Sequence, residues 1–409
     1  MDTMDYDVIC IGGGAASFFA ALQFKSRCPD RSCAIIERGK SLLQKVKISG
    51  GGRCNVTNVI TDPFQLSEHY PRGQKALIGP FNTWSTQDTV QWFESRGVAI
   101  KAEPDGRMFP VTNDSATIVD CLIGEARQLG VVIITRENIT DFNHIEAEDR
   151  WQVDGQQQTY RCTRLFMGTG SNTRIWQLLQ AKGIKIVDPV PSLFTFNIKD
   201  PLIKNLPGLS VPRATVTVPS AKMSAEGPLL ITHWGLSGPA ILRLSAWGAR
   251  KLADCQYKFD IHVDWLSEQD TMSQLFHLQK SAPTKCIKNT PLAPLPSRLW
   301  LSFLTAANID PEKRWAEASK KAISHLSDRL SRYPFHVNGK STFKEEFVTA
   351  GGVALKGVDF KAFNARAHPS LYFAGEVLDI DGITGGFNFQ AAWTGGYIAG
   401  THMAASMSD

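Results

Sequence analysis

A glycine run near the start of the chain has the spacing of a dinucleotide-binding turn. Gly12, Gly13 and Gly14 follow an apolar segment, 6–11, and precede a segment of small residues, 15–27. The first segment is typical of a strand and the second of a helix, so the glycines form the turn between them. There Gly12 permits the tight turn, and Gly14 lets a pyrophosphate approach the backbone at the positive end of the helix.

An acidic residue supports this interpretation. Glu37 ends a second apolar segment, 32–37, and stands 23 residues after Gly14 (37 − 14), where its carboxylate can accept both hydroxyls of a ribose. The same carboxylate disfavours a 2′-phosphate, so the tightly bound nucleotide is not expected to be NADP. The third position of the motif holds Ser17 instead of glycine, so the helix and the strand must pack around a small hydroxyl.

A second glycine run, Gly50–Gly52, is suited to the same kind of ligand. It lies in the segment 45–58 and is followed by Arg53 and Asn55. The free amides of such a loop and the guanidinium suit phosphate groups or the edge of a flavin ring. Because the segment comes soon after Glu37, we expect the loop to lie near the nucleotide.

A third motif stands near the end of the chain. The apolar segment 371–374 leads to Gly375, which permits a close approach of the backbone to a ligand, and to Glu376, which can accept a sugar or ribityl hydroxyl. Gly385 and Gly386 then precede a segment typical of a helix. The positive end of that helix would stabilise an anionic reduced flavin.

Four segments together resemble one protein family. They are Lys45–Asn58, Gly106–Pro110, Thr232–Pro239 and Ala374–Gln390. The resemblance is to the BaiN-like (YhiN-like) NAD(P)/FAD-dependent oxidoreductases, also labelled aminoacetone oxidase family FAD-binding enzymes, and it covers nearly the whole chain in the expected order. One segment differs. After the expected strand at 165–168, relatives carry a longer glycine, tyrosine and proline run, whereas here residues 169–176 lead directly into a helix.

The resemblance implies FAD as a tightly bound cofactor, with NADH or NADPH as a transient electron donor. Family members have been linked to the saturation of activated C=C bonds, in steroid-like enones and in uridine of ribosomal RNA, and to the oxidation of aminoacetone. The residues expected to hold the cofactor are Gly12, Gly13, Gly14, Ala15, Ala16, Glu37, Arg38, Lys45, Ser49, Gly50, Gly51, Gly52, Arg53, Cys54, Asn55, Val132, Gly168, Thr169, Gly170, Gly375, Glu376, Asp381, Gly386, Phe387 and Asn388.

The alternation of strand and helix patterns in the first part of the chain predicts a parallel sheet covered on both faces. Residues 189–219 are typical of a twisted antiparallel sheet, and residues 267–330 have a helical pattern. With the resemblance, these patterns predict an α/β fold: a FAD-binding Rossmann-like (glutathione-reductase-type) domain with an inserted β-barrel-like sheet and a helical cap. The expected boundaries are 1–189 and 346–409 for the FAD-binding domain and 190–345 for the inserted substrate or cap domain, with its sheet at about 190–262 and its helices at about 263–330.

His233 is the candidate catalytic residue. It stands between Thr232 and Trp234, on a loop expected to face the cap cavity, where it can protonate a substrate carbanion after hydride delivery. A hydrogen-bonded structural histidine is the alternative. Cys28 and Cys33 have the spacing of flavin disulfide reductases, but Cys28 precedes the second expected strand and Cys33 stands near its start, on the adenosine side, so no redox disulfide is expected. No pattern of metal ligands is present.

The composition sets few limits on partners. Among 409 residues, lysine and arginine exceed aspartate and glutamate by 5 (44 against 39), which permits an anionic partner such as RNA without requiring one. The eight cysteines are dispersed and contain no C-x-x-C, as in a reduced cytoplasmic protein. The apolar segment 6–24 follows acidic residues and contains three glycines, so neither a signal peptide nor a membrane span is expected.

These observations favour a reductase in which NADH or NADPH loads FAD and the flavin passes hydride to an activated C=C bond of a small molecule. The sequence has no second G-x-G-x-x-G pattern, which predicts that the nicotinamide binds without a domain of its own. Three alternatives stay open: an amine oxidase that uses oxygen, an RNA-modifying flavoprotein, and a non-catalytic flavin-bound regulator.

Overall fold

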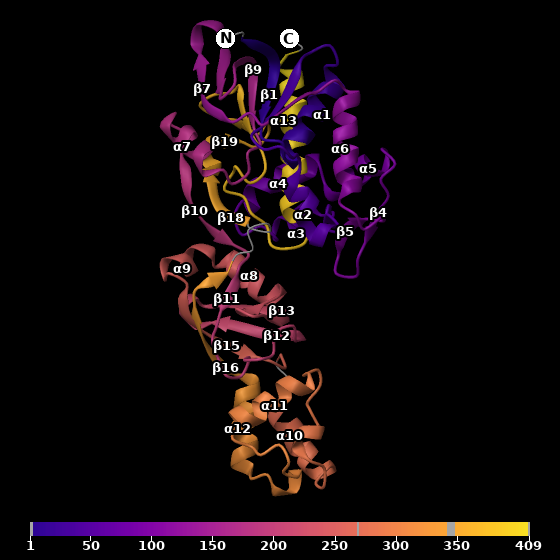
Figure 1. The fold of residues 1–409 in the computed structure, drawn as a ribbon, viewed down its shortest axis with the longest axis vertical. Coiled ribbons are helices and arrows are strands. Elements are labelled where there is room, and N and C mark those ends of the chain that lie inside the picture. The colour runs from indigo at the N-terminus through magenta and orange to yellow at the C-terminus, as the bar shows by residue number, and fades with distance from the viewer. Residues whose placement is uncertain (1–2, 268–269, 342–347, 408–409) are drawn as a thin grey trace. The chain divides into compact units, whose positions relative to one another are not determined.

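The structure, a computed structural model, describes residues 3–267, 270–341 and 348–407. The chain divides into two compact units (Figure 1). The first contains Met1–Pro189 and Val348–Asp409, and the second contains Val190–Phe347. The predicted start of the C-terminal segment at residue 346 lies outside the described residues. β10 (Ile186–Ser192) and β18 (Val348–Val353) form a two-stranded sheet where the chain leaves and re-enters the first unit.

Five parallel strands form the centre of the first unit. Their order is β21 (Leu371–Phe373), β9 (Thr159–Met167), β1 (Met4–Ile11), β2 (Cys33–Glu37) and β6 (Val132–Thr135). Antiparallel strands extend this sheet: β20 (Asn364–Ala365) and β19 (Val358–Asp359) follow β21, and the hairpin of β7 (Ile139–Ile145) and β8 (Arg150–Gly155) pairs with β9. The last four residues of β1 are buried, as expected of a strand covered on both faces.

Two helices of the first unit, α1 (Ala15–Arg27) and α13 (Phe387–Ala405), run side by side (Figure 1). A Cβ atom on Gly396 would lie 2.6 Å from the Ala16 carbonyl oxygen, and one on Gly400 would lie 2.4 Å from that of Ala20. The two backbones therefore approach closely only because these positions are glycine.

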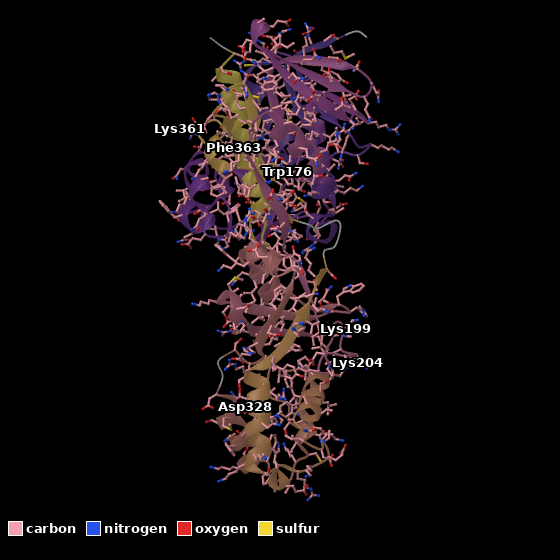
Figure 2. The ribbon with its side chains drawn as sticks, turned by 90° about the vertical axis from the view of Figure 1, so that its left-hand side faces the viewer. Trp176, Lys199, Lys204, Asp328, Lys361 and Phe363 are labelled. Carbon is pink, nitrogen blue, oxygen red and sulfur yellow. The ribbon has the colours of Figure 1, made fainter. Side chains whose placement is uncertain are left out.

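Shorter elements complete the first unit. The helices are α2 (Gln44–Gly52), α3 (Pro63–Ser67), α4 (Gln74–Thr83), α5 (Thr86–Glu94), α6 (Ala116–Gln128) and α7 (Thr173–Ala181). A small antiparallel sheet has the order β3 (Thr57–Asn58), β5 (Arg107–Pro110) and β4 (Ile100–Ala102). α7 begins directly after the glycines that follow β9, as the sequence predicts. Trp176 on this helix is labelled in Figure 2, and its indole N–H donates to the Val377 carbonyl at 2.9 Å.

The second unit contains a seven-stranded antiparallel sheet. Its order is β16 (Tyr333–Asn338), β15 (Lys258–Asp264), β12 (Ser210–Val218), β13 (Met223–Ile231), β14 (Gly235–Ser237), β11 (Thr195–Asn197) and β17 (Lys340–Ser341). Its two edge strands, β16 and β17, are separated along the chain by Gly339 alone. The Gly339 N–H donates to the Tyr257 carbonyl at 2.8 Å, and its carbonyl accepts from the Asn197 N–H at 3.0 Å. The sheet therefore closes on itself, which confirms the predicted barrel-like sheet.

The helices of the second unit are α8 (Pro239–Trp247), α9 (Ala249–Asp254), α10 (Thr271–Ser281), α11 (Ser297–Ala306) and α12 (Lys320–Ser331). The barrel and the helical part share one apolar core. In it the ring of Phe303 on α11 lies 5.8 Å from that of Trp265 and 6.0 Å from that of Tyr333, both edge-on. Among the helices of the described ranges, none is both long and apolar enough to cross a membrane.

Candidate functional site

The carboxyl ends of the parallel strands in the first unit bring together four of the predicted segments. They are Gly12–Gly14 after β1, Glu37–Arg38 after β2, Gly168–Gly170 after β9 and Gly375–Glu376 after β21. A Cβ atom on Gly12 would lie 2.6 Å from the Gly168 carbonyl oxygen, and one on Gly170 would lie 3.7 Å from Oε2 of Glu376. This edge is where open α/β sheets bind their ligands.

The first glycine turn has two glycines with different roles. Gly12 has φ +97° and stands against the Gly168 backbone, so no other residue fits there. Gly14 has φ −99°, and the nearest atom to a Cβ at this position is 3.7 Å away. The protein itself would therefore tolerate a side chain at Gly14, and the space over it is available to a ligand. No side chain caps α1, so its first amides, at Ala15 and Ala16, point to the same place.

Glu37 is held in position by the same turn. Its Oε2 accepts from the Gly13 N–H at 2.7 Å, and its Oε1 accepts from the Gly39 N–H at 2.7 Å. A carboxylate has about four acceptor positions, so each oxygen retains one for a further donor. Arg38 beside it is exposed.

Two buried hydroxyls near this edge have no hydrogen-bond partner among the described residues. They are Ser17 Oγ and Thr169 Oγ1. Ser17 fills the third position of the glycine motif, and Gly168 makes room for it, because a Cβ there would lie 2.1 Å from the hydroxyl. Thr169 lies between Gly168 and Gly170 at the end of β9. Its hydroxyl is a polar group that a bound ligand could satisfy.

The second glycine run also has an open backbone. Gly50, Gly51 and Gly52 have φ of +59°, +68° and +84°, and a Cβ on either of the last two would meet no atom within 4 Å. Lys45 on α2 forms an ion pair with Glu376, which joins this loop to the end of β21. The structure thus brings together residues that the sequence separates by 331 positions.

Three side chains of this loop are occupied within the protein. Arg53, predicted to suit phosphate groups or the edge of a flavin ring, forms an ion pair with Glu103 and lies 4.0 Å above the ring of Phe109. Ser49 Oγ donates to the Val46 carbonyl at 3.0 Å. Burial raises the pKa of the Cys54 thiol to about 12. Cys54 is therefore a protonated, inert thiol at neutral pH.

The N-terminus of α13 is tied to the loop that follows the second glycine run. In the amide orientation that satisfies both its oxygen and its nitrogen, Asn55 accepts from the Gly386 N–H at 2.8 Å and donates to the Thr57 carbonyl at 3.0 Å. Gly386 has φ +87°, and a Cβ on it would lie 2.4 Å from the Thr57 carbonyl oxygen. Asn388 uses both ends of its amide on the backbone of Gly382, at 2.8 and 3.0 Å. Asn55 and Asn388 are thus engaged with the backbone of this segment, which they hold in shape.

Sequence reasoning missed the segment 69–73, which packs against the same region. Tyr70 donates its hydroxyl to the Phe387 carbonyl at 2.6 Å, and Arg72 binds both carboxylate oxygens of the fully buried Asp381. Asp381 was predicted to bind the cofactor, but its carboxylate is engaged by Arg72. No motif marks this segment, because its partners lie more than 300 positions away.

Two predicted residues lie elsewhere. Val132 pairs with Ala34 at the amino end of β6 and is 43% exposed, whereas Thr135 pairs with Glu37 at the carboxyl end. Parallel strands place their carboxyl ends at one edge, so the structure brings Thr135, and not Val132, to the site. His233 belongs to the second unit, where it is exposed on the tight turn between β13 and β14. No described residue hydrogen-bonds to its ring, in contrast to the structural alternative.

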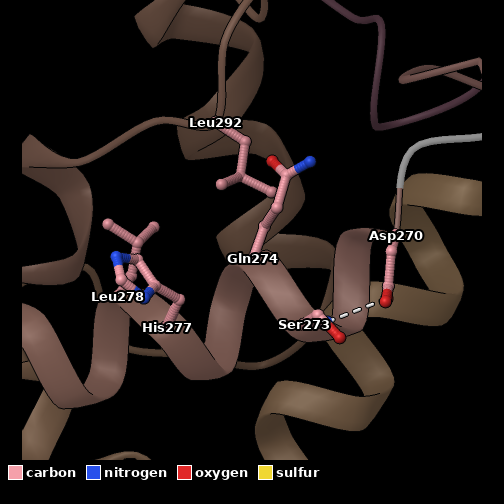
Figure 3. A pocket seen from close by; sticks show the side chains of 6 residues that line it. All are labelled: Asp270, Ser273, Gln274, His277, Leu278 and Leu292. Carbon is pink, nitrogen blue, oxygen red and sulfur yellow. Dashed lines mark hydrogen bonds between the residues drawn. The ribbon is translucent and has the colours of Figure 1, made fainter.

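A pocket in the helical part of the second unit contains none of the predicted residues (Figure 3). It has a volume of about 430 Å³ and is lined by Asp270, Ser273, Gln274, His277, Leu278 and Leu292. The Asp270 carboxylate is engaged in capping α10 through the Ser273 N–H, at 2.9 Å. Within the described ranges, no group of three or more His, Cys, Asp or Glu side chains could hold a metal ion, and all eight cysteines are free.

Comparison with known proteins gives matches over nearly the full length. A family model described as the HI0933-like protein Rossmann domain matches residues 6–402. The ribosomal RNA dihydrouridine synthase of Haemophilus influenzae is 28% identical over 401 residues, which cover 95% of this chain and 96% of the relative. The protein of the same name from Escherichia coli is 29% identical over 419 residues, covering 98% and 99%. The 3-dehydro-bile acid delta(4,6)-reductase of Clostridium scindens is 26% identical over 404 residues, covering 95% and 97%.

Two solved structures share the fold. The 3-ketosteroid-delta4-(5alpha)-dehydrogenase of Rhodococcus jostii RHA1 has a TM-score of 0.53 at 12% identity, covering 98% of this chain and 97% of that one. The open conformation of a flavocytochrome c3 fumarate reductase has a TM-score of 0.53 at 14% identity, covering 99% and 79%. Together with the family model, they confirm the predicted fold class.

Proposed function

The chain belongs to the HI0933-like Rossmann-domain family of FAD-dependent oxidoreductases, and we propose that it takes hydride from NADH or NADPH and reduces an activated C=C bond. FAD supplies the redox chemistry in such enzymes, and the protein supplies binding, orientation and charge. The residues at the strand ends fit this cofactor. The space over Gly14, the open space beside Gly51 and Gly52 and the unpartnered Thr169 hydroxyl suit its phosphates and sugar chain.

The choice of a C=C bond reduction as the proposed reaction rests on the names of the relatives. A delta(4,6)-reductase of a 3-dehydro-bile acid and a dihydrouridine synthase act on very different molecules. Both names describe the saturation of a C=C bond conjugated to a carbonyl group. In that reaction a hydride goes to the carbon remote from the carbonyl, and a proton goes to the adjacent carbon. This shared chemistry supports a conjugated C=C bond as the target in this chain.

The first prediction concerns the adenosine half of the cofactor. Replacing Glu37 with alanine is expected to weaken FAD binding by about 1.5–3 kcal/mol, the range for a hydrogen bond to a charged group. The Gly13 and Gly39 amides also lose their acceptor, so the turn loses order. Titration of the apoprotein with FAD, followed by flavin fluorescence, measures the change. Glu37→Gln retains one oxygen and should lie between the two, and unchanged affinity in both variants would remove Glu37 from the site.

The second prediction concerns the direction of electron flow. Stopped-flow mixing should show that NADH or NADPH reduces the bound FAD and that air reoxidises it slowly. With 2-cyclohexen-1-one as a probe, His233→Ala should slow reoxidation of the flavin by about 10²-fold if His233 donates the proton. The same variant should leave reduction by the nicotinamide unchanged. An equal loss in both half-reactions would instead indicate a structural His233. Fast oxygen-driven turnover of aminoacetone, with no response to either nicotinamide, would establish an oxidase.

A second candidate function is the reduction of uridine in RNA, and the distribution of charge favours it. Residues 190–347 contain 20 lysines and arginines against 13 aspartates and glutamates, an excess of 7, whereas the whole chain has an excess of only 5. The net positive charge of the chain therefore lies in the second unit, since the remaining residues contain 24 lysines and arginines against 26 aspartates and glutamates. Lys199 and Lys204 are exposed there (Figure 2), and Trp234 is 57% exposed, as suits contact with phosphates and stacking on a base.

RNA binding distinguishes the two candidates. If RNA is the substrate, affinity for a ribosomal RNA fragment should fall steeply with salt, and the double variant Lys199→Ala with Lys204→Ala should reduce that salt dependence. Lys361→Ala, an exposed lysine of the first unit, is the matched control (Figure 2). If the protein binds RNA weakly, and neither salt nor the double variant changes that affinity, the reduction of a small molecule is the candidate function that remains.

A further inference from the structure

The segment 69–73 holds a histidine against the N-terminus of α13. The Ile383 N–H donates to the His69 carbonyl at 3.0 Å, and the Asp381 N–H donates to the Arg72 carbonyl at 3.4 Å. Glycine permits this close contact, because a Cβ on Gly73 would lie 2.8 Å from the side chain of Ile380. With the Tyr70 hydroxyl and the ion pair of Arg72, these bonds fix the segment to residues 380–387.

The His69 ring lies on Phe387, the first residue of α13. The two rings are stacked, with centroids 4.4 Å apart and an interplanar angle of 20°. Nδ1 of His69 lies 2.9 Å from the Gln65 carbonyl oxygen. Because a carbonyl oxygen only accepts, Nδ1 carries the hydrogen in this bond. Nε2 is then the nitrogen that gains or loses a proton, and no described residue hydrogen-bonds to it.

Apart from Arg38, which is exposed, the ionisable groups named at this edge of the sheet are already engaged. Lys45 pairs with Glu376, Arg53 with Glu103, and Arg72 with Asp381, while Glu37 is held by two amides. Three further described histidines of the first unit lie elsewhere. His402 bonds to Tyr372 in the last turn of α13, and His144 and His368 lie beside Trp151. Among the described histidines of the first unit, His69 is thus the one that packs against the N-terminus of α13.

The electrostatics around His69 depend on what binds at the site. The first turn of α13 contains no acidic residue, so its positive end disfavours a second positive charge nearby. The other charged groups on the elements packed around His69 are Asp62 and Glu68 at the ends of α3, Asp379, and the pair of Arg72 and Asp381. An anion bound at the helix end would offset the positive charge of the helix N-terminus and so favour a protonated imidazole.

We propose that His69 is a charge-compensating residue of the flavin site, which takes up a proton when FAD is reduced and releases it on reoxidation. The inference rests on the proposed function only for the binding and reduction of FAD. Reduction of the flavin by two electrons and one proton produces an anion, and the neutral imidazole takes the second proton from water. By linkage, a state that binds an additional proton gains stability as the pH falls, so the reduction potential rises with it.

Counting protons tests the proposal in the holoenzyme. Anaerobic reduction with dithionite, in weakly buffered solution with an indicator dye and repeated over a series of pH values, should show an uptake that rises from one toward two protons per flavin in part of the series. His69→Gln should reduce this to one throughout. Its midpoint potential should fall below that of the wild type at low pH and meet it at high pH. His402→Gln, at the other end of the same helix, should behave as the wild type.

Each outcome is decisive. A wild-type count of one proton across the whole range overturns the proposal, and so does a higher count that persists in His69→Gln. If His69→Gln fails to retain FAD, the proton count of the wild type is combined with histidine NMR spectra of the oxidised and reduced protein. Only the His69 signal should then show a change in protonation between the two states. A wild-type protein that binds no FAD would instead refute the proposed function.

Discussion

A valine at position 14 is expected to give a folded protein that no longer retains FAD. Gly14 is free of contacts that would exclude a side chain, since the nearest atom to a Cβ there is 3.7 Å away. The branched side chain would stand where the pyrophosphate meets the first amides of α1. The fold therefore tolerates the substitution, and the cofactor does not. Gly12 cannot serve for this test, because a Cβ there meets the Gly168 carbonyl oxygen at 2.6 Å and would disturb the fold itself.

The measurement compares flavin content with folding. The wild-type protein should be yellow and release FAD, not FMN, on denaturation, because FMN lacks the adenosine ribose that we propose Glu37 binds. Gly14→Val should be colourless with an unchanged circular dichroism spectrum. Gly124→Val is the matched control, since Gly124 is exposed on α6 and a Cβ on it meets nothing within 4 Å. Full FAD occupancy in Gly14→Val would refute the assignment of the site.

The substitution Arg72→Met is expected to lower the free energy of unfolding by about 3–5 kcal/mol, because it leaves a buried carboxylate without its partner. The Asp381 side chain is 0% exposed, and its carboxylate accepts hydrogen bonds from two nitrogens of Arg72. Removing both charges together should cost less, so the double variant Arg72→Met with Asp381→Leu should recover part of the loss. Urea denaturation followed by circular dichroism measures these differences.

An exposed ion pair provides the control. Arg150 and Asp5 lie 2.7 Å apart with both side chains more than a third exposed, and Arg150→Met should change stability by less than about 1 kcal/mol. Equal effects of Arg72→Met and Arg150→Met would show that the pair with Asp381 is not a buried one in solution. Because Asp381 precedes the segment that reaches α13, Arg72→Met should also weaken FAD binding.

The strand-turn-helix-strand unit with Glu37 could be recognised from the sequence because all its parts lie within 37 residues. β1 and β2 are neighbours in the sheet, so the turn glycines and the acid meet by local geometry, and the structure shows the Gly13 amide bound to Glu37. The barrel-like sheet was also predicted as a class. Its closure was not, since it depends on Gly339 linking two edge strands that are adjacent in the chain and opposite in the sheet.

Side-chain roles at the site depended on partners that no local pattern reveals. The sequence indicates Lys45, Arg53, Glu376 and Asp381 as polar residues of glycine-rich loops, but only the fold shows which of them neutralise one another or other groups. Strand register decided that Thr135, and not Val132, lies beside Glu37. The stretch that contains His69, Tyr70 and Arg72 has no motif or periodic pattern. Its role follows from contacts with Asp381 and Phe387, which lie more than 300 residues later in the chain.

The sequence by itself determined the glycine turn after β1, the fold class and the segments that meet at the strand ends, because glycine spacing, strand patterns and helix starts depend on neighbouring residues. The tertiary structure alone decided which charges are paired, which hydroxyls are left without partners and which histidine lies against α13. Those properties arise from contacts between distant segments, and a contact of this kind depends on the path of the whole chain.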